Sequence, residues 1–341
     1  MTETSIHTEP LAPPIRPVGK RVLSIAAHVV LAVTLLVVPL LAVFLPVVLF
    51  HCGVRNGRRA AWLVLLAASA IVLLLVLPGA PQASAIANGN LSFFLGLVLA
   101  VGLPSVLALP LIERGERFGR VLLFALLASL GGLLATEAIM QLAASYSPYT
   151  AQLAATHDFT AKALDFYGKN GLTADNVHML RKWMNMGSFV LPGFILIDAA
   201  IIFVLSLVLF VRLPAWRQFA ERHGLPAPGA YLFRNLALPE WLLFAFVLGG
   251  VSPLLSGMPQ RIGASALAVV AFLYMLQGLA IFRAFVAAAS GGFTLFAWGA
   301  LGLLTLTGIA PVLLAIAGLF DSFFDFRHFN RKDSSDESHS H

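Results

Sequence analysis

The chain has 341 residues, of which 59% are hydrophobic and only 11% are charged, and its formal net charge at pH 7 is +6. Soluble domains carry about 25% charged residues, so a water-soluble fold of this length is excluded. The basic residues stand in short segments between apolar runs, which is typical of membrane topology signals and argues against nucleic-acid binding. The single cysteine, Cys52, excludes an internal disulfide and a cysteine-rich metal site.

Long apolar runs predict an all-α fold, a polytopic bundle of transmembrane helices. A run of about 20 residues is long enough to cross a hydrocarbon core of about 30 Å as a helix. Such runs predict about eight spans between a disordered N-terminal tail at 1–21 and a polar C-terminal tail at 321–341. The runs lie at 22–50, 60–80, 89–112, 120–146, 188–212, 238–256, 262–286 and 293–320.

The first and last apolar runs are longer than one span needs, and both contain helix-breaking residues. Pro39 and Pro46 lie in the first run, and Gly308 and Pro311 lie in the last. If the first run crosses once, the basic N-terminal tail lies outside, against the positive-inside rule. A broken helix or a tight hairpin in each run would return both termini to the cytoplasm and would raise the number of spans to about ten.

Two basic stops with a shared Arg-x-Gly-Arg pattern interrupt the apolar runs. The first contains Arg55 and Arg58, and the second contains Arg117 and Arg120. Because two apolar runs separate the stops, both must face the same side of the membrane. The turn between those two runs, GAPQASAIANGN, has no Lys or Arg. The stops are therefore expected in the cytoplasm, where the four arginines serve as topology signals or as a docking surface for a protein partner.

The same alternation predicts an external loop at 147–187 and a cytoplasmic loop at 213–237. In the external loop, Thr173 is a candidate N-cap for a helix over 174–186. This short helix is expected on the outer membrane interface, either as a lid on the helix ends or as a mobile gate. Its apolar residues share one face, with a tryptophan beside them: Val177, Leu180, Met184 and Trp183.

Few polar side chains lie within the apolar runs, and these are the candidate ligand-binding residues. Glu137 and Gln141 lie one turn apart in the outer half of one run, and Asp198 lies near the middle of the next. An ionisable residue at the bilayer centre costs about 2.5–3.5 kcal/mol and usually faces the bundle interior. These residues, with Gln277, predict a ligand or ion site open to the outside. The alternative is that the acids are protonated and only hydrogen-bond helices together.

The C-terminal stretch GLFDSFFDFRHFNR carries acids and bases just beyond the last apolar run. Asp321 and Asp325 are four residues apart and share a helical face, and Arg327 follows them. These three residues are candidates for pairing with a cytoplasmic loop or partner. Two carboxylates without further ligands are not sufficient for a metal site, so no metal ion is predicted.

Common catalytic patterns do not occur in the sequence. The chain has no Gly-x-x-x-x-Gly-Lys-Ser/Thr phosphate loop, no His-Glu-x-x-His zinc pair and no Gly-x-Ser-x-Gly elbow. We therefore predict that the protein is not an enzyme, needs no cofactor and does not drive itself with ATP.

Several patches, taken in order, resemble one family of membrane proteins. They are PLLAVFLPVVLFHCGVRNGRRAAWL, GLPSVLALPLIERGERFGR, FRNLALPEWLL, QGLAIFRAF and GLFDSFFDFR. Over roughly 35–330 the chain resembles the uncharacterised bacterial YybS-type integral membrane proteins. That family is distantly similar to the substrate-binding membrane subunits of energy-coupling-factor vitamin transporters, which capture a small vitamin from outside while separate subunits power its uptake. Those subunits have fewer helices than are predicted here, and no clear coupling motif is present.

Together these features predict a multi-pass protein of the bacterial inner membrane. Its expected role is small-molecule binding or a transport-related function, with an outward-facing pocket at Glu137, Gln141 and Asp198. The alternative is a non-catalytic membrane scaffold or assembly factor. The expected partners are the lipid bilayer, a cytoplasmic or membrane protein and a small-molecule ligand, without nucleic acid.

Overall fold

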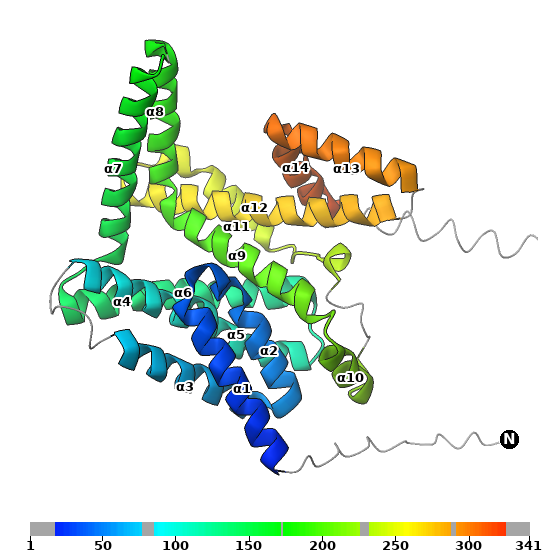
Figure 1. The fold of residues 1–341 in the computed structure, drawn as a ribbon. Helices are drawn as coiled ribbons and strands as arrows, with labels where there is room; N and C mark the ends of the chain where they lie inside the picture. The colour runs from blue at the N-terminus through cyan, green and yellow to red at the C-terminus, as the bar shows by residue number, and fades with distance from the viewer. Residues whose placement is uncertain (1–17, 77–84, 172, 226–231, 288–290, 325–341) are drawn as a thin grey trace, which may run out of the picture.

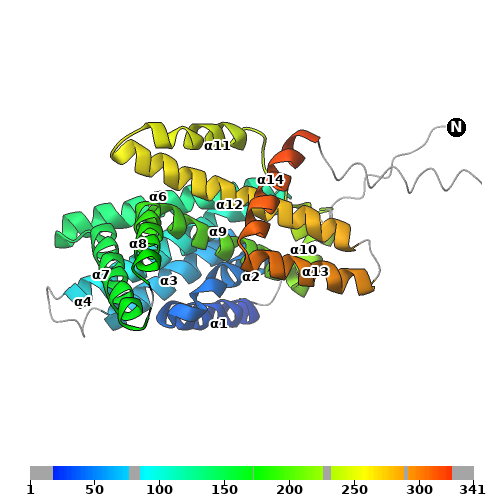
Figure 2. The same ribbon diagram turned by 90° about the horizontal axis from the view of Figure 1, so that it is seen from above.

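The computed structural model describes residues 18–76, 85–171, 173–225, 232–287 and 291–324, and within these ranges all regular secondary structure is helical. Most of the helices stack side by side, with the α7–α8 pair across one end of the stack (Figures 1 and 2). The elements are α1 Val18–Val37, η1 Pro39–Phe44, α2 Leu45–Asn56, α3 Arg58–Val76, α4 Ala85–Leu97, η3 Val98–Gly102, α5 Leu103–Glu113, α6 Phe118–Ala144, α7 Pro148–Lys169, α8 Ala174–Phe189, α9 Leu191–Phe210, α10 Pro214–Arg222, η5 Phe233–Asn235, α11 Leu242–Gly250, η6 Ser252–Leu254, α12 Met258–Ala287, α13 Gly291–Leu306 and α14 Ile309–Phe324.

The predicted polytopic helical bundle is confirmed. Among the described residues, 7 helices are long and apolar enough to cross a membrane, or 8 if the bent pair α13–α14 is one span. The run at 238–256 yields only a shorter apolar helix over Leu242–Leu254. The first apolar run contributes two of the long helices, because it is divided at its prolines.

The first apolar run forms a helical hairpin. Val38 is extended, and Pro39 then opens the short helix η1 before α2 begins. Arg21 at the start of α1 donates from Nη2 to the carbonyl oxygen of Asn56 at the end of α2, at 2.9 Å. The two ends of the run therefore meet, as the hairpin alternative requires. Helix α1 begins at Val18, so the last residues assigned to the N-terminal tail are helical.

A π-helical turn in the α4–α5 span has an identifiable cause. Pro104 has no N–H with which to bond the carbonyl oxygen of Ala100, four residues earlier, and its ring crowds that carbonyl. The helix widens to a π turn over Val98–Gly102, and Ser129 of α6 lies with its hydroxyl 2.7 Å from the Ala100 oxygen. Gly132 of α6 permits this approach, because a Cβ there would lie 2.0 Å from the Leu99 oxygen.

Replacing Ser129 with alanine is expected to lower the free energy of unfolding by about 1 kcal/mol, a typical value for an interhelical hydrogen bond in a membrane. The loss follows because the Ala100 carbonyl, which cannot accept from Pro104, would also lose the hydroxyl, which lies at a similar distance, 2.8 Å, from the Ala125 carbonyl oxygen of its own helix. Thermal unfolding of the purified protein in nanodiscs measures the effect. Ser105→Ala is the matched control, because that buried hydroxyl donates only to Val101 within its own helix, at 2.6 Å. Equal losses in the two variants would contradict the account.

Helices α12 and α14 cross with their backbones in close contact. A Cβ at Gly278 would lie 1.9 Å from the Leu314 oxygen, and one at Gly318 would lie 2.0 Å from the Tyr274 oxygen. Small residues at such crossings are characteristic of helix packing in membranes, where van der Waals contact replaces the hydrophobic drive between helices. Helix α14 is therefore held firmly against the bundle.

The last apolar run bends sharply, as its glycine predicted. Helices α13 and α14 are bent by 111° at their junction, where Gly308 has a φ of 75°. Helix α14 continues through Asp321, which is buried in contact with α12. Asp321 thus belongs to the helical domain and not to the polar tail that was predicted to begin there.

The segment at 147–187 is a helical hairpin of α7 and α8. The N-cap prediction at Thr173 is confirmed, because its Oγ1 accepts from the Asn176 backbone N–H at 3.5 Å. Helix α7 was not predicted, although Ser147 as N-cap followed by Pro148 is a recognisable helix start. Figures 1 and 2 show that the hairpin runs across the direction of α12.

The basic loops gather at one end of the bundle, called the basic end here. Arg58 at the start of α3 forms an ion pair with Glu113 at the end of α5, which ties the two stops together. The segment after α9 also reaches this end: a Cβ at Gly119 would lie 2.0 Å from the Ala237 oxygen. The prediction that both stops face the same side is therefore confirmed by direct contact.

Candidate functional site

Glu137 of α6 binds the first residues of α7 through its carboxylate. Its carboxylate accepts from the Tyr149 backbone N–H at 3.0 Å and from the Ser147 hydroxyl. Gln141, one turn further along α6, is exposed. Glu137 therefore has a structural role at the end opposite the basic end, and its proposed contact with a ligand stays a prediction.

Asp198 lies on an exposed stripe of α9. Within the described part of the chain it has no hydrogen-bond or ion-pair partner, and its side chain faces away from the packed helices. The stripe is otherwise apolar, with members spaced four, three and four residues apart on one helical face: Phe194, Asp198, Ile201 and Leu205. A carboxyl group on such a stripe is costly in lipid unless a hydrogen-bond donor or a cation lies beside it, and the described residues provide neither.

Gln277 is buried in a polar link between helices. Its Oε1 accepts from the Leu238 backbone N–H at 3.1 Å, and its Nε2 donates to Asp321 Oδ2 at 3.0 Å. The structure thus joins two residues that were predicted for different roles, one for a ligand and one for a partner. The link connects α12, α14 and the segment before α11. The cavity between α2 and α10 and the groove between α7 and α8 are lined by none of the four predicted ligand residues, Glu137, Gln141, Asp198 and Gln277.

Two of the four stop arginines are occupied within the chain. Arg58 pairs with Glu113, and Arg120 pairs with Glu116 at 3.1 Å. Arg117, in the N-cap position of α6, is exposed. Arg55 is exposed in the last turn of α2 and lines a cavity. Asp325 and Arg327 lie outside the described residues.

Helix α10 forms one wall of that cavity. It begins at Pro214, the favoured residue at a first helical position, and buries an apolar face against the end of α9. The Trp216 ring lies 5.4 Å from the Phe210 ring, and Phe219 and Ala220 are also buried. The opposite face of α10, which carries Gln218 and Arg222, is thereby directed toward α2.

The cavity, called the basic-end pocket here, has a volume of about 260 Å³. It lies between the last turns of α2 and the polar face of α10, and no acidic side chain is among its lining residues in the described part of the chain. Arg222 is partly fixed, because its Nε donates to the Gln218 carbonyl oxygen at 2.8 Å. The lining residues are His51, Arg55, Pro214, Ala215, Gln218 and Arg222.

A pair of histidines adjoins the pocket. His28 Nδ1 lies 2.6 Å from the Ser24 carbonyl oxygen, which can only accept, so this nitrogen carries a proton. His28 Nε2 lies 2.8 Å from His51 Nδ1. Because the other ring nitrogen of His28 carries the proton, His51 donates from Nδ1 to His28 Nε2. The pair therefore fixes the orientation of the His51 ring beside the pocket.

A comparison with known families finds a match over most of the chain. The family DUF2232, described as a predicted membrane protein, matches residues 25–322, from α1 into α14. The chain belongs to this family. The match agrees with the apolar helices, so the protein is an integral, multi-pass membrane protein in contact with the lipid bilayer. No curated protein and no solved structure matches the chain significantly.

The sequence of this DUF2232 protein contained a signal for the pocket. His51 and Arg55 are spaced four residues apart, as are Gln218 and Arg222, so each pair shares one helical face. Sequence reasoning missed the site because α10 is short and its pairing with α2 spans a large separation along the chain.

Among the described residues, no group of three or more His, Cys, Asp and Glu side chains is placed to hold a metal ion.

Proposed function

We propose that the protein binds a small anionic molecule, carrying a phosphate or carboxylate group, in the basic-end pocket. The observation that carries this proposal is the lining, which combines Arg55, Arg222 and His51 without an acid. Guanidinium groups bind phosphate and carboxylate oxygens through charge-assisted, often bidentate hydrogen bonds. The hydrogen bond between His51 and His28 orients the His51 ring beside the two arginines.

This proposal keeps a small-molecule-binding or transport-related role but moves the site. By the positive-inside rule the basic end is cytoplasmic, in the inner membrane of a bacterium. The chain resembles YybS-type proteins, which are distantly similar to vitamin-capturing membrane subunits. This resemblance supports the binding of a small molecule within a membrane domain, but not the side of entry, because those subunits capture their vitamin from outside. The proposal includes no catalysis and no cofactor.

Native mass spectrometry tests the proposal. The protein in neutral-lipid nanodiscs is offered phosphatidic acid or glycerol phosphate, which present the same phosphomonoester from the lipid and from water. Because each lost charge-assisted hydrogen bond costs about 1.5–3 kcal/mol, the double variant Arg55→Gln/Arg222→Gln is expected to lower the bound fraction about tenfold or more. The arm that shows binding identifies the source of the ligand.

A matched control separates the pocket from overall charge. Arg117→Gln/Arg217→Gln removes the same two charges from exposed positions that do not line the pocket. Binding in this control should equal that of the wild type. Equal binding by the two double variants, or no binding of either probe to the wild type, would overturn the proposal.

A second candidate, a membrane scaffold or assembly factor, is favoured by Asp198. A carboxyl group on an otherwise apolar, exposed stripe is costly in lipid, and a hydrogen-bond donor or cation on a partner helix would offset that cost. The same native spectra distinguish the candidates. Recovery of a stoichiometric protein partner that is lost in Asp198→Leu, with no bound anion, would favour the scaffold.

A further inference from the structure

The α7–α8 hairpin is a distinct element built on the outer surface of the bundle. Its helices pack chiefly against each other, with Thr160 and Leu164 of α7 buried between them. At 1.5 Å per residue the 22-residue α7 is about 33 Å long. In Figure 1 the tip of the hairpin extends well past α11 and α12, so its distal half does not lie over those helices.

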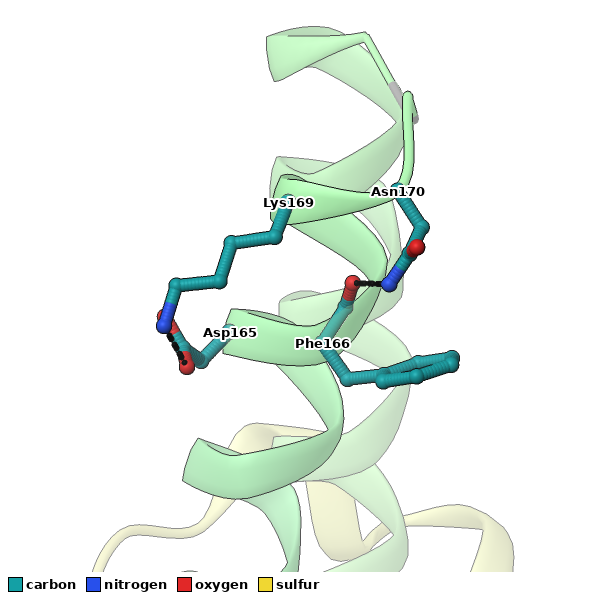
Figure 3. A network of polar contacts seen from close by, with 4 residues as sticks. All are labelled: Asp165, Phe166, Lys169 and Asn170. Carbon is teal, nitrogen blue, oxygen red and sulfur yellow. Dashed lines mark hydrogen bonds and ion pairs between the residues drawn. The ribbon is translucent and has the colours of Figure 1, made fainter.

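One face of the hairpin is polar and hollowed. An open groove of about 430 Å³ runs between the two helices. Its lining repeats every four residues on each helix, with His157, Ala161 and Asp165 on α7 and Val177, Arg181 and Asn185 on α8. At the tip, Lys169 pairs with Asp165 at 2.7 Å, and Figure 3 shows the Phe166 ring directed to a different side of α7 from this pair.

The opposite face, called the apolar face of the hairpin, exposes large apolar side chains. Residues two apart lie about 200° from each other around a helix. Phe159 is two residues from Ala161, and Met179 and Trp183 are two residues on either side of Arg181, so these side chains point away from the groove. The members are 48% to 68% exposed: Phe159, Phe166, Met179, Trp183 and Met186.

Both ends of the hairpin are fastened where membrane-spanning helices end. Helix α7 begins directly after α6, where Glu137 binds the Tyr149 N–H. Helix α8 leads into α9. At that junction the guanidinium of Arg261, which lies at the start of α12, is 5.5 Å from the centre of the Phe189 ring at the end of α8. Because spanning helices end at the bilayer surface, the hairpin starts at that level and runs across the helix direction (Figure 2).

We propose that the hairpin lies in the interfacial layer of the bilayer, with its apolar face inserted between lipid headgroups and acyl chains. The observations together fit an in-plane amphipathic element, which buries one apolar face about 5–10 Å into this layer and keeps the other in water. Tryptophan and lysine suit that depth. In this placement the groove with Asp165 and Arg181 faces water. This inference is independent of the basic-end pocket.

Site-directed fluorescence tests the assignment in the full-length protein. Cys52, which is buried, is replaced by alanine, and single cysteines carrying an environment-sensitive dye are placed by Phe159→Cys and Trp183→Cys. Ala161→Cys and Arg181→Cys are matched controls on the same helices, at exposed positions that line the groove on the opposite face. In nanodiscs, a nitroxide attached near the top of the acyl chain is expected to quench the apolar-face dyes about threefold more than the controls, with blue-shifted emission. Size-exclusion profiles confirm that each variant is folded.

Two results would overturn the assignment. If aqueous iodide quenches all four dyes equally and the lipid nitroxide quenches none, the hairpin stands in water. If the apolar-face dyes are shielded from both quenchers in native membrane vesicles but open to iodide in nanodiscs, another protein covers this face. Preferential lipid quenching in both preparations is the result that the inference predicts.

Discussion

Replacing Gly318 with leucine is expected to disrupt the crossing of α12 and α14. The first side-chain carbon would lie 2.0 Å from the Tyr274 oxygen and 2.8 Å from the Gly278 nitrogen. Both obstacles are backbone atoms, so the clash cannot be relieved by a change of rotamer. Overpacking of a close contact costs about 1–3 kcal/mol and occasionally more, and we expect the upper end of this range or beyond. The helices would have to separate, which would also pull apart the nearby Gln277–Asp321 bond.

The measurement is the fraction of monodisperse protein that survives heating, followed by size-exclusion chromatography with a fluorescent fusion. Gly299→Leu and Gly302→Leu in α13 are the controls, because a Cβ at either position meets nothing within 4 Å. We expect these controls to melt like the wild type and Gly318→Leu to melt much earlier or to yield little folded protein. A Gly318→Leu variant as stable as the controls would show that α12 and α14 do not cross in this way.

Replacing Gln277 with leucine is expected to destabilise the same region by a different route. Leucine is close to glutamine in volume, so packing is largely kept, but the Leu238 N–H loses its acceptor and Asp321 loses a donor. A buried polar group left without its partner costs about 1–3 kcal/mol, and this substitution affects two such groups. The apparent melting temperature should therefore fall clearly below that of the wild type.

A double-mutant cycle makes this second result specific. Asp321→Leu removes the other half of the pair, and residues in direct contact show interaction energies of about 0.5–3 kcal/mol. The double variant Gln277→Leu/Asp321→Leu is expected to lose less stability than the sum of the two single variants. Strictly additive losses would mean that the two side chains do not interact, and the polar link between α12 and α14 would be refuted.

Much of the architecture could be predicted from local patterns. Apolar runs define the spans because lipid requires helices that satisfy their own backbone hydrogen bonds. Pro39 and Gly308 mark the breaks at each end because one lacks an N–H and the other adopts a positive φ. The shared side of the two stops followed from counting spans, and the contact of Arg58 with Glu113 bears it out.

The polar contacts between distant segments could not be predicted in the same way. Gln277 meets Asp321 across 44 residues, and His28 meets His51 only because the first run folds back on itself. Charge and depth alone suggested that Glu137 lines a cavity, whereas its carboxylate is engaged at the start of α7. Side-chain partners of this kind depend on tertiary packing, which a single sequence does not encode in a local pattern.

The most direct test of the central claim is an electron cryo-microscopy map of the protein in nanodiscs, with an antibody fragment to aid alignment, recorded with and without the anion found by mass spectrometry. The account predicts new density in the basic-end pocket, within hydrogen-bond distance of the guanidinium groups of Arg55 and Arg222, only when the anion is present. Density for the anion at Glu137 and Asp198 at the opposite end, with the basic-end pocket unchanged, would contradict it.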